Sequence, residues 1–326
     1  MKTPITYISF EDMCDYMDEK GIQGEAFVFY IDFKATRGWI GTTEEAQKSG
    51  INFSIGACVD KKQSIPEFIF EKYPIPAETY GEKFTAIKQA LQQGDSFLVN
   101  LTQPTPITCS LTLKQIFELA QATYKLYVPG QFVVFSPETF IKVNKSTISC
   151  YPMKGTLEVK NNPNPSRLQS NAKEQAEHAT IVDLIRNDLS QVAFPIHVEK
   201  YKYIDQIKSH EGDLWQMSSQ ITGDLLPEFQ GKIGSILRKL LPAGSISGAP
   251  KPSTLQIIDK IEGYERGFYT GVMGHFDGQE LNSGVMIRFI EQQGDSLIFK
   301  SGGGITVFSE EEMEYHELIQ KVYLPF

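Results

Sequence analysis

The spacing of hydrophobic residues along this chain alternates between two patterns. Longer segments carry apolar residues every three to four positions, as a helix with one buried face does, at 82–94, 111–126 and 173–193 and after Ser309. Shorter apolar runs bounded by turn-forming residues are typical of strands, and they lie at 25–33, 51–59, 96–102, 131–135, 139–143 and 147–152. This alternation predicts a mixed α/β fold.

The segment 158–175 is rich in Asn, Pro and Ser, which predicts a surface loop and also has the composition of a domain linker. The apolar patterning resumes on both sides of it, and we find no internal repeat and no low-complexity tract. We therefore predict one large domain that spans residues 1–326.

The charge balance narrows the class of partner. The chain has 326 residues, with 31 Lys and Arg against 40 Asp and Glu, and its formal net charge is −9. An acidic chain without basic runs is a poor binder of nucleic acid, because phosphate binding needs clustered Lys and Arg. The first twenty residues do not resemble a signal peptide, and no apolar stretch is long enough to span a membrane. We expect a cytoplasmic enzyme or binding protein with no nucleic-acid or membrane partner.

The cysteines do not suggest a metal site or a disulfide framework. They lie far apart and in no metal-binding spacing, which predicts reduced, structural residues, at Cys14, Cys58, Cys109 and Cys150.

Carboxylates on two predicted helices are candidates for binding a hard cation. Glu177 lies off the apolar stripe of the helix at 173–193, and Glu314 and Glu317 share a face of the last helix. Ser309 and Glu312 have the spacing of a capping box for that last helix. If the two helices converge, their carboxylates would suit Mg²⁺. Solvated helix charges are the commoner case, so composition alone favours that interpretation.

Two glycine-rich segments, 242–253 and 301–312, precede predicted helices. Backbone N–H groups at such turns bind anions, because the helix dipole and the unpaired donors point the same way. Neither segment has the spacing of a phosphate-binding P-loop or a dinucleotide fingerprint. A small substrate that carries carboxylates fits better than a nucleotide, and ordinary tight turns are the alternative.

Four further residues have candidate chemistry. Lys154 ends an apolar strand and precedes a glycine, so a dry pocket there would make its amine a nucleophile or base. Glu138, which follows Ser136 and Pro137, could stay protonated and act as a general acid. Arg288 is expected within an apolar strand, paired with an anion, and Tyr269 offers a hydroxyl near a glycine turn. For a lysine taken alone, a plain surface cation is the commoner case.

The order of these segments resembles the chorismate-utilising enzyme family. The blocks that carry the resemblance are SFLVNLT, FSPETF, YPMKGT, KEQAEHATIVDLIRNDLSQV, LPAGSISGAPK, RGFYTGVMGH, NSGVMIRFIE and SGGGITVFSEEEMEYHELIQKV. They cover the chain from about Gly94 to its end, and residues 1–93 would form a shortened N-terminal portion of the same fold. The resemblance implies an α/β fold with two large stacked, mostly antiparallel sheets flanked by helices, and a Mg²⁺-dependent active site.

One block distinguishes the members of that family. The run Pro152-Met153-Lys154-Gly155-Thr156 is similar to the version in aminodeoxychorismate synthases, where the lysine is a nucleophile, whereas anthranilate synthases have alanine there. Isochorismate and salicylate synthases have a lysine that activates water at the position of Leu98. The resemblance thus implies amination of chorismate at C4, toward p-aminobenzoate and folate, with anthranilate synthase component I as the alternative.

The resemblance also assigns roles. Lys154 would be the nucleophile and Glu138 the acid, and Mg²⁺ would be held by Glu177 and Glu317 with Glu314 close by. The substrate would be held by a group of residues comprising Thr156, Gln216, Tyr269, Arg288, Gly302, Gly303 and Gly304. Because the chain has no G-x-C-x-G nucleophile motif, ammonia would come from a partner glutamine amidotransferase.

The chain departs from the family pattern at three places. Gln216 replaces a histidine, so the amide there cannot supply a proton. Ala243 stands where the family has a second glycine, which matters only if that position needs a positive φ. The part before Gly94 is short, so we do not expect feedback by tryptophan.

Overall fold

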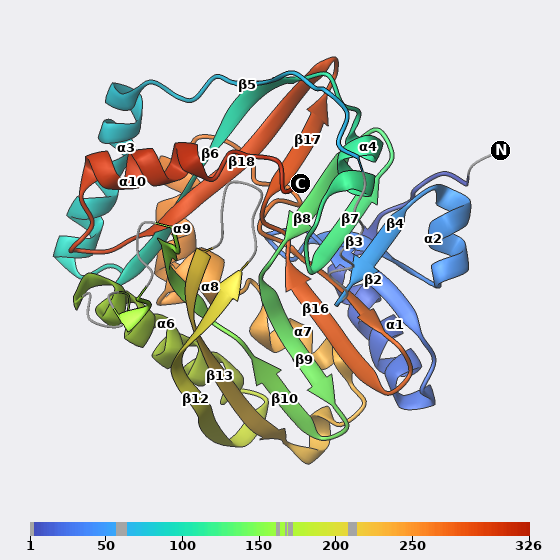
Figure 1. Ribbon diagram of the computed structural model, residues 1–326. Helices are drawn as coiled ribbons and strands as arrows, with labels where there is room; N and C mark the ends of the chain where they lie inside the picture. Colours follow the sequence, from blue (N-terminus) through green and yellow to red (C-terminus); the bar gives the residue numbers. More distant parts are fainter. Residues whose placement is uncertain (1–2, 57–63, 161–163, 167, 169–171, 208–213) are drawn as a thin grey trace.

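The computed structural model describes residues 3–56, 64–160, 164–166, 168, 172–207 and 214–326. Within these residues the chain forms two large β-sheets with helices packed around them (Figure 1). The helices are α1 (Phe10–Gln23), α2 (Thr43–Ser49), α3 (Ala77–Gln93), α4 (Leu113–Leu119), α6 (Ala172–Leu189), the 3₁₀ turn η1 (Pro227–Phe229), α7 (Ile233–Leu240), α8 (Gly244–Ser247), α9 (Lys251–Ile261) and α10 (Glu311–Gln320).

The first sheet is built from three stretches of the chain, 8–41, 139–225 and 272–285. Its strands, in spatial order, are β1 (Ile8–Ser9), β3 (Arg37–Gly41), β2 (Phe27–Ile31), β15 (Val272–Phe276), β16 (Glu280–Val285), β9 (Thr139–Asn144), β10 (Thr147–Cys150), β13 (Leu214–Leu225) and β11 (Met153–Glu158). The long strand β12 (Ala193–Ile207) also pairs with β13.

The second sheet carries the glycine-rich strand of the chain. Its strands, in spatial order, are β14 (Gly248–Ala249), β6 (Leu98–Cys109), β18 (Ser296–Ile305), β17 (Phe289–Gln293), β8 (Phe132–Ser136), β7 (Tyr124–Val128) and β4 (Asn52–Ile55). Strand β5 (Phe70–Lys72) pairs with β6. Every strand pair described in the two sheets is antiparallel.

The alternation of side chains along the strands shows that the two sheets are stacked. In β2, Val28 and Tyr30 pack with residues of β7 and β8 from the second sheet, whereas Phe29 packs on the opposite face with residues of α1 and α7. In β8, Val134 joins the same inter-sheet core, while Val133 packs with α4 on the outer face. Successive side chains of a strand point to opposite faces, so one apolar layer lies between the sheets. The expected fold of two stacked antiparallel sheets flanked by helices is confirmed.

Local signals explain where several helices begin and end. A capping box at Thr42 and Glu45 begins α2, and Gly94 ends α3 in the left-handed conformation. Helix α10 packs on β18 and next to α3 (Figure 1), and α6 packs against β11 and β13. Helices α3 and α10 thus pack on the second sheet, and α6 packs on the first. Among the described residues, no helix is long and apolar enough to cross a membrane.

The predicted helix at 111–126 is wrong in its second half. Helix α4 ends at Leu119, and β7 begins at Tyr124. From Tyr124 onward the buried residues alternate with partly exposed ones, and Leu126 and Val128 follow Tyr124 on the same buried face. This period of two, in a run with aromatic and β-branched residues, is the pattern of a strand that pairs with neighbours on both sides.

The predicted capping box of the last helix is also wrong. Helix α10 begins one residue later than that pattern requires, with Glu310 at the N-cap and no side-chain cap. The Ser309 hydroxyl instead accepts a hydrogen bond from the N–H of Thr306, in the turn that leads into the helix. Cys14, Cys109 and Cys150 are free thiols, as predicted, and Cys58 lies outside the described residues.

Candidate active site

Seven of the residues singled out in the sequence line a single pocket at the glycine-rich end of β18: Glu138, Lys154, Tyr269, Arg288, Gly302, Gly303 and Gly304. The remaining lining residues come from β6, α8, the connection before β17, β18 and the end of α10: Asn100, Ser245, Ile246, Ile287, Lys300, Ser301 and Lys321. The pocket therefore lies where both sheets and two helices meet, and segments about 200 residues apart in sequence contribute to it.

Lys154 reaches the pocket from an irregular strand. It lies at the start of β11, not at the end of the preceding strand as expected, and the pairing of β11 with β13 shifts between Met153 and Thr156. Gly155 has φ 79°, a conformation that suits glycine. The Lys154 amine lies over Gly304, since a Cβ built on that glycine would be 3.2 Å from Nζ. The bulge thus aims the amine at the second sheet.

Glu138 lies in the connection between β8 and β9. Its N–H donates to the Ser136 hydroxyl at 3.1 Å, and its carboxyl accepts a hydrogen bond from the Ser245 hydroxyl at 2.7 Å. The residue as a whole is partly exposed, but its carboxyl group is shielded from water, and this burial raises the pKa of Glu138. The hydrogen bond from Ser245 and the nearby basic side chains of Lys154, Lys321 and Arg288 oppose that rise in pKa. A carboxyl group in this environment can hold a proton and deliver it.

The glycines at 302–304 form part of a strand, not the helix-preceding turn that we expected. They pair residue for residue with Thr102, Leu101 and Asn100 of β6. A side chain on Gly302 would lie 2.6 Å from the Leu101 carbonyl oxygen, so the close approach of the two strands requires glycine. The prediction of a turn here is wrong because sheet pairing outweighs the turn preference of glycine.

The other glycine-rich segment is a turn before a helix, as predicted. It forms the single turn α8, the short strand β14 and then α9. Gly248 has φ 126°, and a Cβ there would lie 1.8 Å from the Leu98 carbonyl oxygen. Ala243 has φ −60°, so this position does not need a second glycine.

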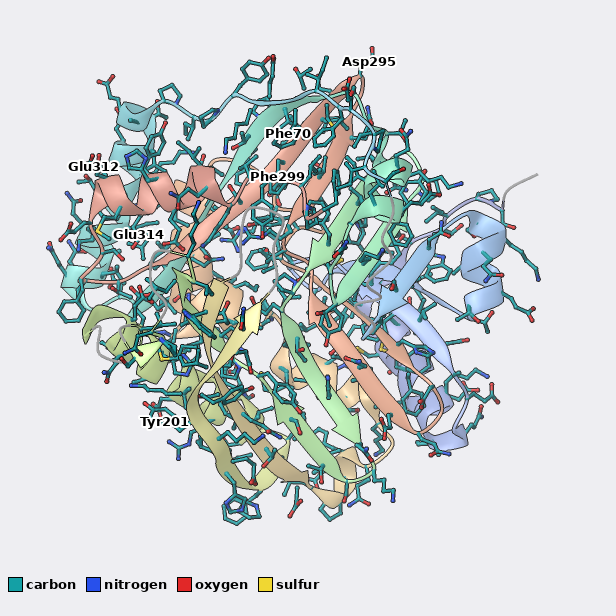
Figure 2. All side chains as sticks on the ribbon, viewed as in Figure 1. Phe70, Tyr201, Asp295, Phe299, Glu312 and Glu314 are labelled. Carbon is teal, nitrogen blue, oxygen red and sulfur yellow. The ribbon has the colours of Figure 1, made fainter. Side chains whose placement is uncertain are left out.

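Two of the three candidate metal ligands lie together. A Cβ built on Gly303 would be 3.5 Å from Glu314 Oε2 and 3.9 Å from Glu317 Oε1, so both carboxylates of α10 face one point over β18. Glu314 is 5% exposed, and Figure 2 shows it on another side of α10 from the solvent-exposed Glu312. The Lys321 ammonium lies 3.6 Å from the same point and 2.6 Å from Glu317 Oε1, so it forms an ion pair with that carboxylate.

This pair fits a magnesium ion, because Mg²⁺ takes one or two carboxylates and keeps water or substrate in its other positions. Glu177 lies on α6, next to the buried His178. Among the described residues, no three His, Cys, Asp or Glu side chains are grouped closely enough to form a metal site. The full set of three carboxylates therefore stays a prediction.

Among the candidate residues, Arg288 has the surroundings that most clearly indicate anion binding. It lies between β16 and β17 with φ 53°, so the expectation that it is embedded in a strand is wrong. Its Nη1 donates to the Lys321 carbonyl oxygen at 3.1 Å, and its guanidinium stacks on the Tyr323 ring. Its Nε is buried and has no hydrogen-bond acceptor in the described part of the chain. A buried, unpaired donor that lines a pocket indicates an anionic ligand.

The remaining predicted substrate residues differ in their placement. Tyr269 is 3% exposed and lines the pocket, and burial raises its pKa. The Gln216 amide donates to the Gly155 carbonyl oxygen at 3.0 Å, so it stabilises the bulge beside Lys154 and does not line the pocket. Thr156 pairs with Gln216 across the two strands.

Several polar residues at the pocket are not predicted by the sequence. Ser245 lies inside a block that carries the family resemblance, but no spacing rule connects it to Glu138. Lys321 lies four residues after Glu317, a spacing that allows the two side chains to pair on a helix but does not indicate that Lys321 lines a pocket. Glu174 is not predicted either, although it lies one helical turn before Glu177 on α6. Its Oε2 lies 2.8 Å from the position of a Cβ on Gly155, so this carboxylate approaches the strand that carries Lys154.

Comparison with known proteins gives a consistent result. Residues 43–325 match the model of a family described as chorismate binding enzyme. A protein of Haemophilus influenzae described as an uncharacterized PabA-like protein is 47% identical over 308 residues, which cover 94% of each chain. Aminodeoxychorismate synthase component 1 of Escherichia coli is 33% identical over 75% of this chain and 56% of that enzyme. Anthranilate synthase component 1 of Spirochaeta aurantia is 31% identical over 76% of this chain and 53% of that enzyme.

The fold is shared with solved structures. A putative 2,3-dihydroxybenzoate-specific isochorismate synthase from Bacillus anthracis superposes with a TM-score of 0.73 at 18% identity, over 98% of this chain and 90% of that one. Identity at this level shows the common fold and does not identify the reaction.

Proposed function

The chain belongs to the chorismate binding enzyme family, and we propose that it aminates chorismate at C4, as an aminodeoxychorismate synthase component I does. The observation that carries this proposal is the Lys154 amine, which lines the pocket together with Glu138. Family members that add ammonia directly at C2 have no use for a nucleophilic lysine at this position. The 33% identity to aminodeoxychorismate synthase component 1 of E. coli also supports it.

The proposed reaction uses two protein groups in turn. The Lys154 amine attacks C2 of the ring, the ring double bond shifts, and the C4–O bond breaks. Glu138 donates its proton to the departing oxygen, which leaves as water. Ammonia then attacks C4, the double bond shifts back, and the C2–N bond breaks to release the lysine amine. The ammonium group formed at C4 gives up one proton, which returns Glu138 to its protonated form. The sum is chorismate plus ammonia giving 4-amino-4-deoxychorismate plus water.

The substrate carboxylates would be held by cationic and backbone donors. Arg288 is suited to one carboxylate because its buried Nε lacks an acceptor among the described residues. Glu314 and Glu317, with Glu177, would hold Mg²⁺, which when bound supplies Lewis-acid stabilisation of a substrate carboxylate. Lys321 would exchange its contact with Glu317 for one with substrate, since its amine is only partly buried.

Ammonia would come from a separate glutamine amidotransferase. The printed sequence contains no G-x-C-x-G motif, so this chain has no candidate nucleophile of that kind for glutamine hydrolysis. The proposed product would feed p-aminobenzoate and folate synthesis after a lyase step. Anthranilate synthase is the second candidate, because the relative from S. aurantia is nearly as similar as the E. coli enzyme.

The test is an incubation of the purified chain with chorismate, Mg²⁺ and excess ammonium at alkaline pH. Half of the sample receives an aminodeoxychorismate lyase, and the products are separated by chromatography and identified by mass spectrometry. We expect p-aminobenzoate only in the half with lyase. Anthranilate in both halves would establish the second candidate, and unchanged chorismate under saturating ammonium would contradict both.

A pair of lysine variants makes this test specific. Lys154→Ala should lower C4 amination by at least about 10³-fold, because the nucleophile is lost. Lys114→Ala removes an exposed lysine on α4 that pairs with Glu118, far from the pocket, and it should keep the full rate. Undiminished C4 amination by Lys154→Ala would refute the assignment of the nucleophile.

A further inference from the structure

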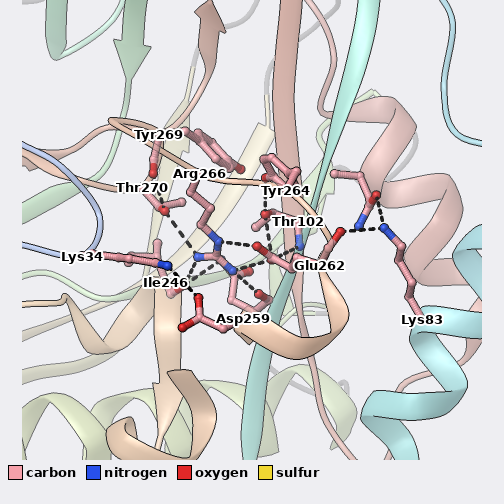
Figure 3. Close-up of polar contacts among 12 residues, drawn as sticks. Lys34, Lys83, Thr102, Ile246, Asp259, Glu262, Tyr264, Arg266, Tyr269 and Thr270 are labelled. Carbon is pink, nitrogen blue, oxygen red and sulfur yellow. Dashed lines mark hydrogen bonds and ion pairs between the residues drawn. The ribbon is translucent and has the colours of Figure 1, made fainter. Parts of the chain in front are cut away.

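A buried ion pair lies directly behind the pocket. Glu262 ends α9, and Arg266 follows it in the connection to β15; both side chains are 2% exposed. Figure 3 shows the two side chains facing each other, with Arg266 Nε 2.8 Å from Glu262 Oε2 and Nη2 2.6 Å from Oε1. The contact is bidentate, which fixes the orientation of the guanidinium as well as its position.

The Arg266 guanidinium uses all five of its N–H donors. Besides the two bonds to Glu262, Nη1 donates to the Ile246 carbonyl oxygen at 2.9 Å and to the Thr270 hydroxyl at 3.3 Å. Nη2 also donates to the Asn100 carbonyl oxygen at 2.6 Å. A guanidinium has five such donors, so none is left to bind a ligand. One side chain therefore connects α8, β6 and the connection before β15.

The three segments that Arg266 contacts are those that shape the pocket. Asn100 and Ile246 line it directly, and the Asn100 amide also donates to the Ile246 carbonyl oxygen at 3.0 Å. Ser245, the residue before Ile246, holds the Glu138 carboxyl. Thr270 follows the pocket residue Tyr269 and has φ 62°, which a β-branched residue rarely adopts.

Glu262 is also held by several hydrogen bonds, as Arg266 is. Its Oε1 accepts hydrogen bonds from the backbone N–H and the hydroxyl of Thr102, both at 2.8 Å. Lys83 of α3 donates to the Glu262 carbonyl oxygen at 2.7 Å, and Lys300 donates to the Arg266 carbonyl oxygen at 2.9 Å. A buried network in which every member has partners selects one arrangement of the elements that it joins.

We propose that Arg266, oriented by Glu262, is a positioning residue that sets the α8 turn and the Tyr269 loop relative to Lys154 and Glu138. This inference rests on the proposed function only in taking this pocket as the active site. Burying two charges gains little folding stability over a well-packed apolar pair. What an apolar pair cannot supply is the set of three directed bonds to Ile246, Thr270 and Asn100.

The decisive experiment compares single and double replacements. Arg266→Met leaves the Glu262 carboxylate buried without its cation, so we expect it to be strongly destabilised. The double variant Glu262→Gln/Arg266→Met removes both charges, keeps side chains of similar size, and retains an amide oxygen to accept from Thr102. We expect its melting temperature to return to near the wild-type value, while kcat/KM for chorismate stays about 10- to 100-fold lower. A purely structural role predicts that stability and activity recover together, and that result would overturn the proposal.

Arg238→Met is the matched control. Arg238 also pairs with two carboxylates, Glu11 and Asp15, but it joins α7 to α1 and does not line the pocket. Its replacement should leave kcat/KM unchanged. If the double variant does not fold, Arg266→Lys takes its place: an ammonium keeps the charge but has three donors instead of five. We expect about a 10-fold loss of kcat/KM for this variant, and wild-type kcat/KM would overturn the proposal.

A structural readout separates this inference from the proposed reaction. The crystal structure of the double variant should show the Ser245 hydroxyl displaced from its 2.7 Å contact with Glu138. An unchanged contact would overturn the positioning role whatever product the enzyme makes. Conversely, a wild-type product other than aminodeoxychorismate would contradict the proposed function, and the same comparison would then be made with that product.

Discussion

Replacing Gly304 with alanine tests whether the position of the Lys154 amine sets the rate. Gly304 lies in β18 opposite Asn100, and its backbone is outside the left-handed region, so alanine can adopt the same conformation. The new Cβ would lie 3.2 Å from Lys154 Nζ and 3.0 Å from Leu98 Cδ1. Ordinary contacts begin at 3.4 Å, so both neighbours must retreat by a few tenths of an ångström. The added methyl group therefore displaces the proposed nucleophile and the end of the Leu98 side chain.

The expected cost follows from that displacement. A misplacement of about 1 Å at a reacting centre costs about 100-fold in rate, so a few tenths of an ångström should lower kcat by about 3- to 10-fold. The KM for chorismate should change little, because the carboxylate-binding groups are not touched. Folding stability should not fall, since alanine in place of a strand glycine gains about 0.5–1 kcal/mol, which offsets the local repacking.

The assay is lyase-coupled formation of p-aminobenzoate, with thermal unfolding measured on the same sample. Gly303→Ala is the companion variant, because its Cβ would lie 3.5 Å from Glu314 Oε2, on the carboxylate side. That variant should change the Mg²⁺ dependence more than the maximal rate. A folded Gly304→Ala enzyme with undiminished kcat would refute the placement of the reacting amine over Gly304.

Three further changes test other groups of the pocket. Ser245→Ala removes the hydrogen bond that lowers the pKa of Glu138, so the alkaline limb of the kcat/KM profile should move to higher pH; an unmoved limb would exclude Glu138 as the acid. Glu138→Gln should cost about 10²- to 10⁴-fold in kcat. Burial raises the pKa of Glu138 in the folded state above its unfolded value of about 4.3. Ionisation of this carboxyl group therefore lowers the stability of the folded wild type as the pH rises from the unfolded pKa through the folded one. The melting temperature of this variant should therefore exceed that of the wild type at neutral pH and match it in acid, and the reverse order would contradict the raised pKa. Glu317→Gln should raise the Mg²⁺ concentration that gives half-maximal activity, and an unaltered metal dependence would remove Glu317 from the ligand set.

Periodicity and block order together predicted the architecture, and periodicity failed where two patterns overlap. Residues 111–126 have apolar spacings that fit a helix, but Tyr124, Leu126 and Val128 lie on one buried face of β7. Residues 124–128 form a strand and not a helix because β4 and β8 pair with them from both sides. The glycines at 302–304 show the same effect, since β6 provides a partner for each of them. Local sequence does not reveal such partners, because β4 lies about 70 residues before β7 and β6 lies about 200 residues before β18.

The recognised blocks predicted which residues gather at the pocket but not how they are held. Lys154 and Gly304 are 150 positions apart in sequence. They meet because the register of β18 on β6 places Gly304 opposite Asn100, and a slip of one residue would turn each side chain to the other face. The partners of the recognised residues could not be inferred in the same way. Ser245, Lys321 and Arg266 are ordinary polar residues in the sequence, and their roles depend on contacts that only the folded chain creates.

The charges that line the pocket also explain how an acidic protein can select an anionic substrate. The chain carries a net charge of −9, yet the described residues that line the pocket include four basic side chains, Lys154, Arg288, Lys300 and Lys321, and one carboxyl, Glu138, whose pKa is raised. Lys300 and Lys321 are paired with Glu291 and Glu317, so Arg288, whose buried Nε has no acceptor among the described residues, is the cation best placed to attract an anion. A recessed cation attracts a dicarboxylate over a short range while the acidic surface repels larger polyanions. The KM for chorismate should therefore rise with ionic strength while kcat stays constant, and a KM that does not depend on salt would show that these cations do not act on the substrate as charges.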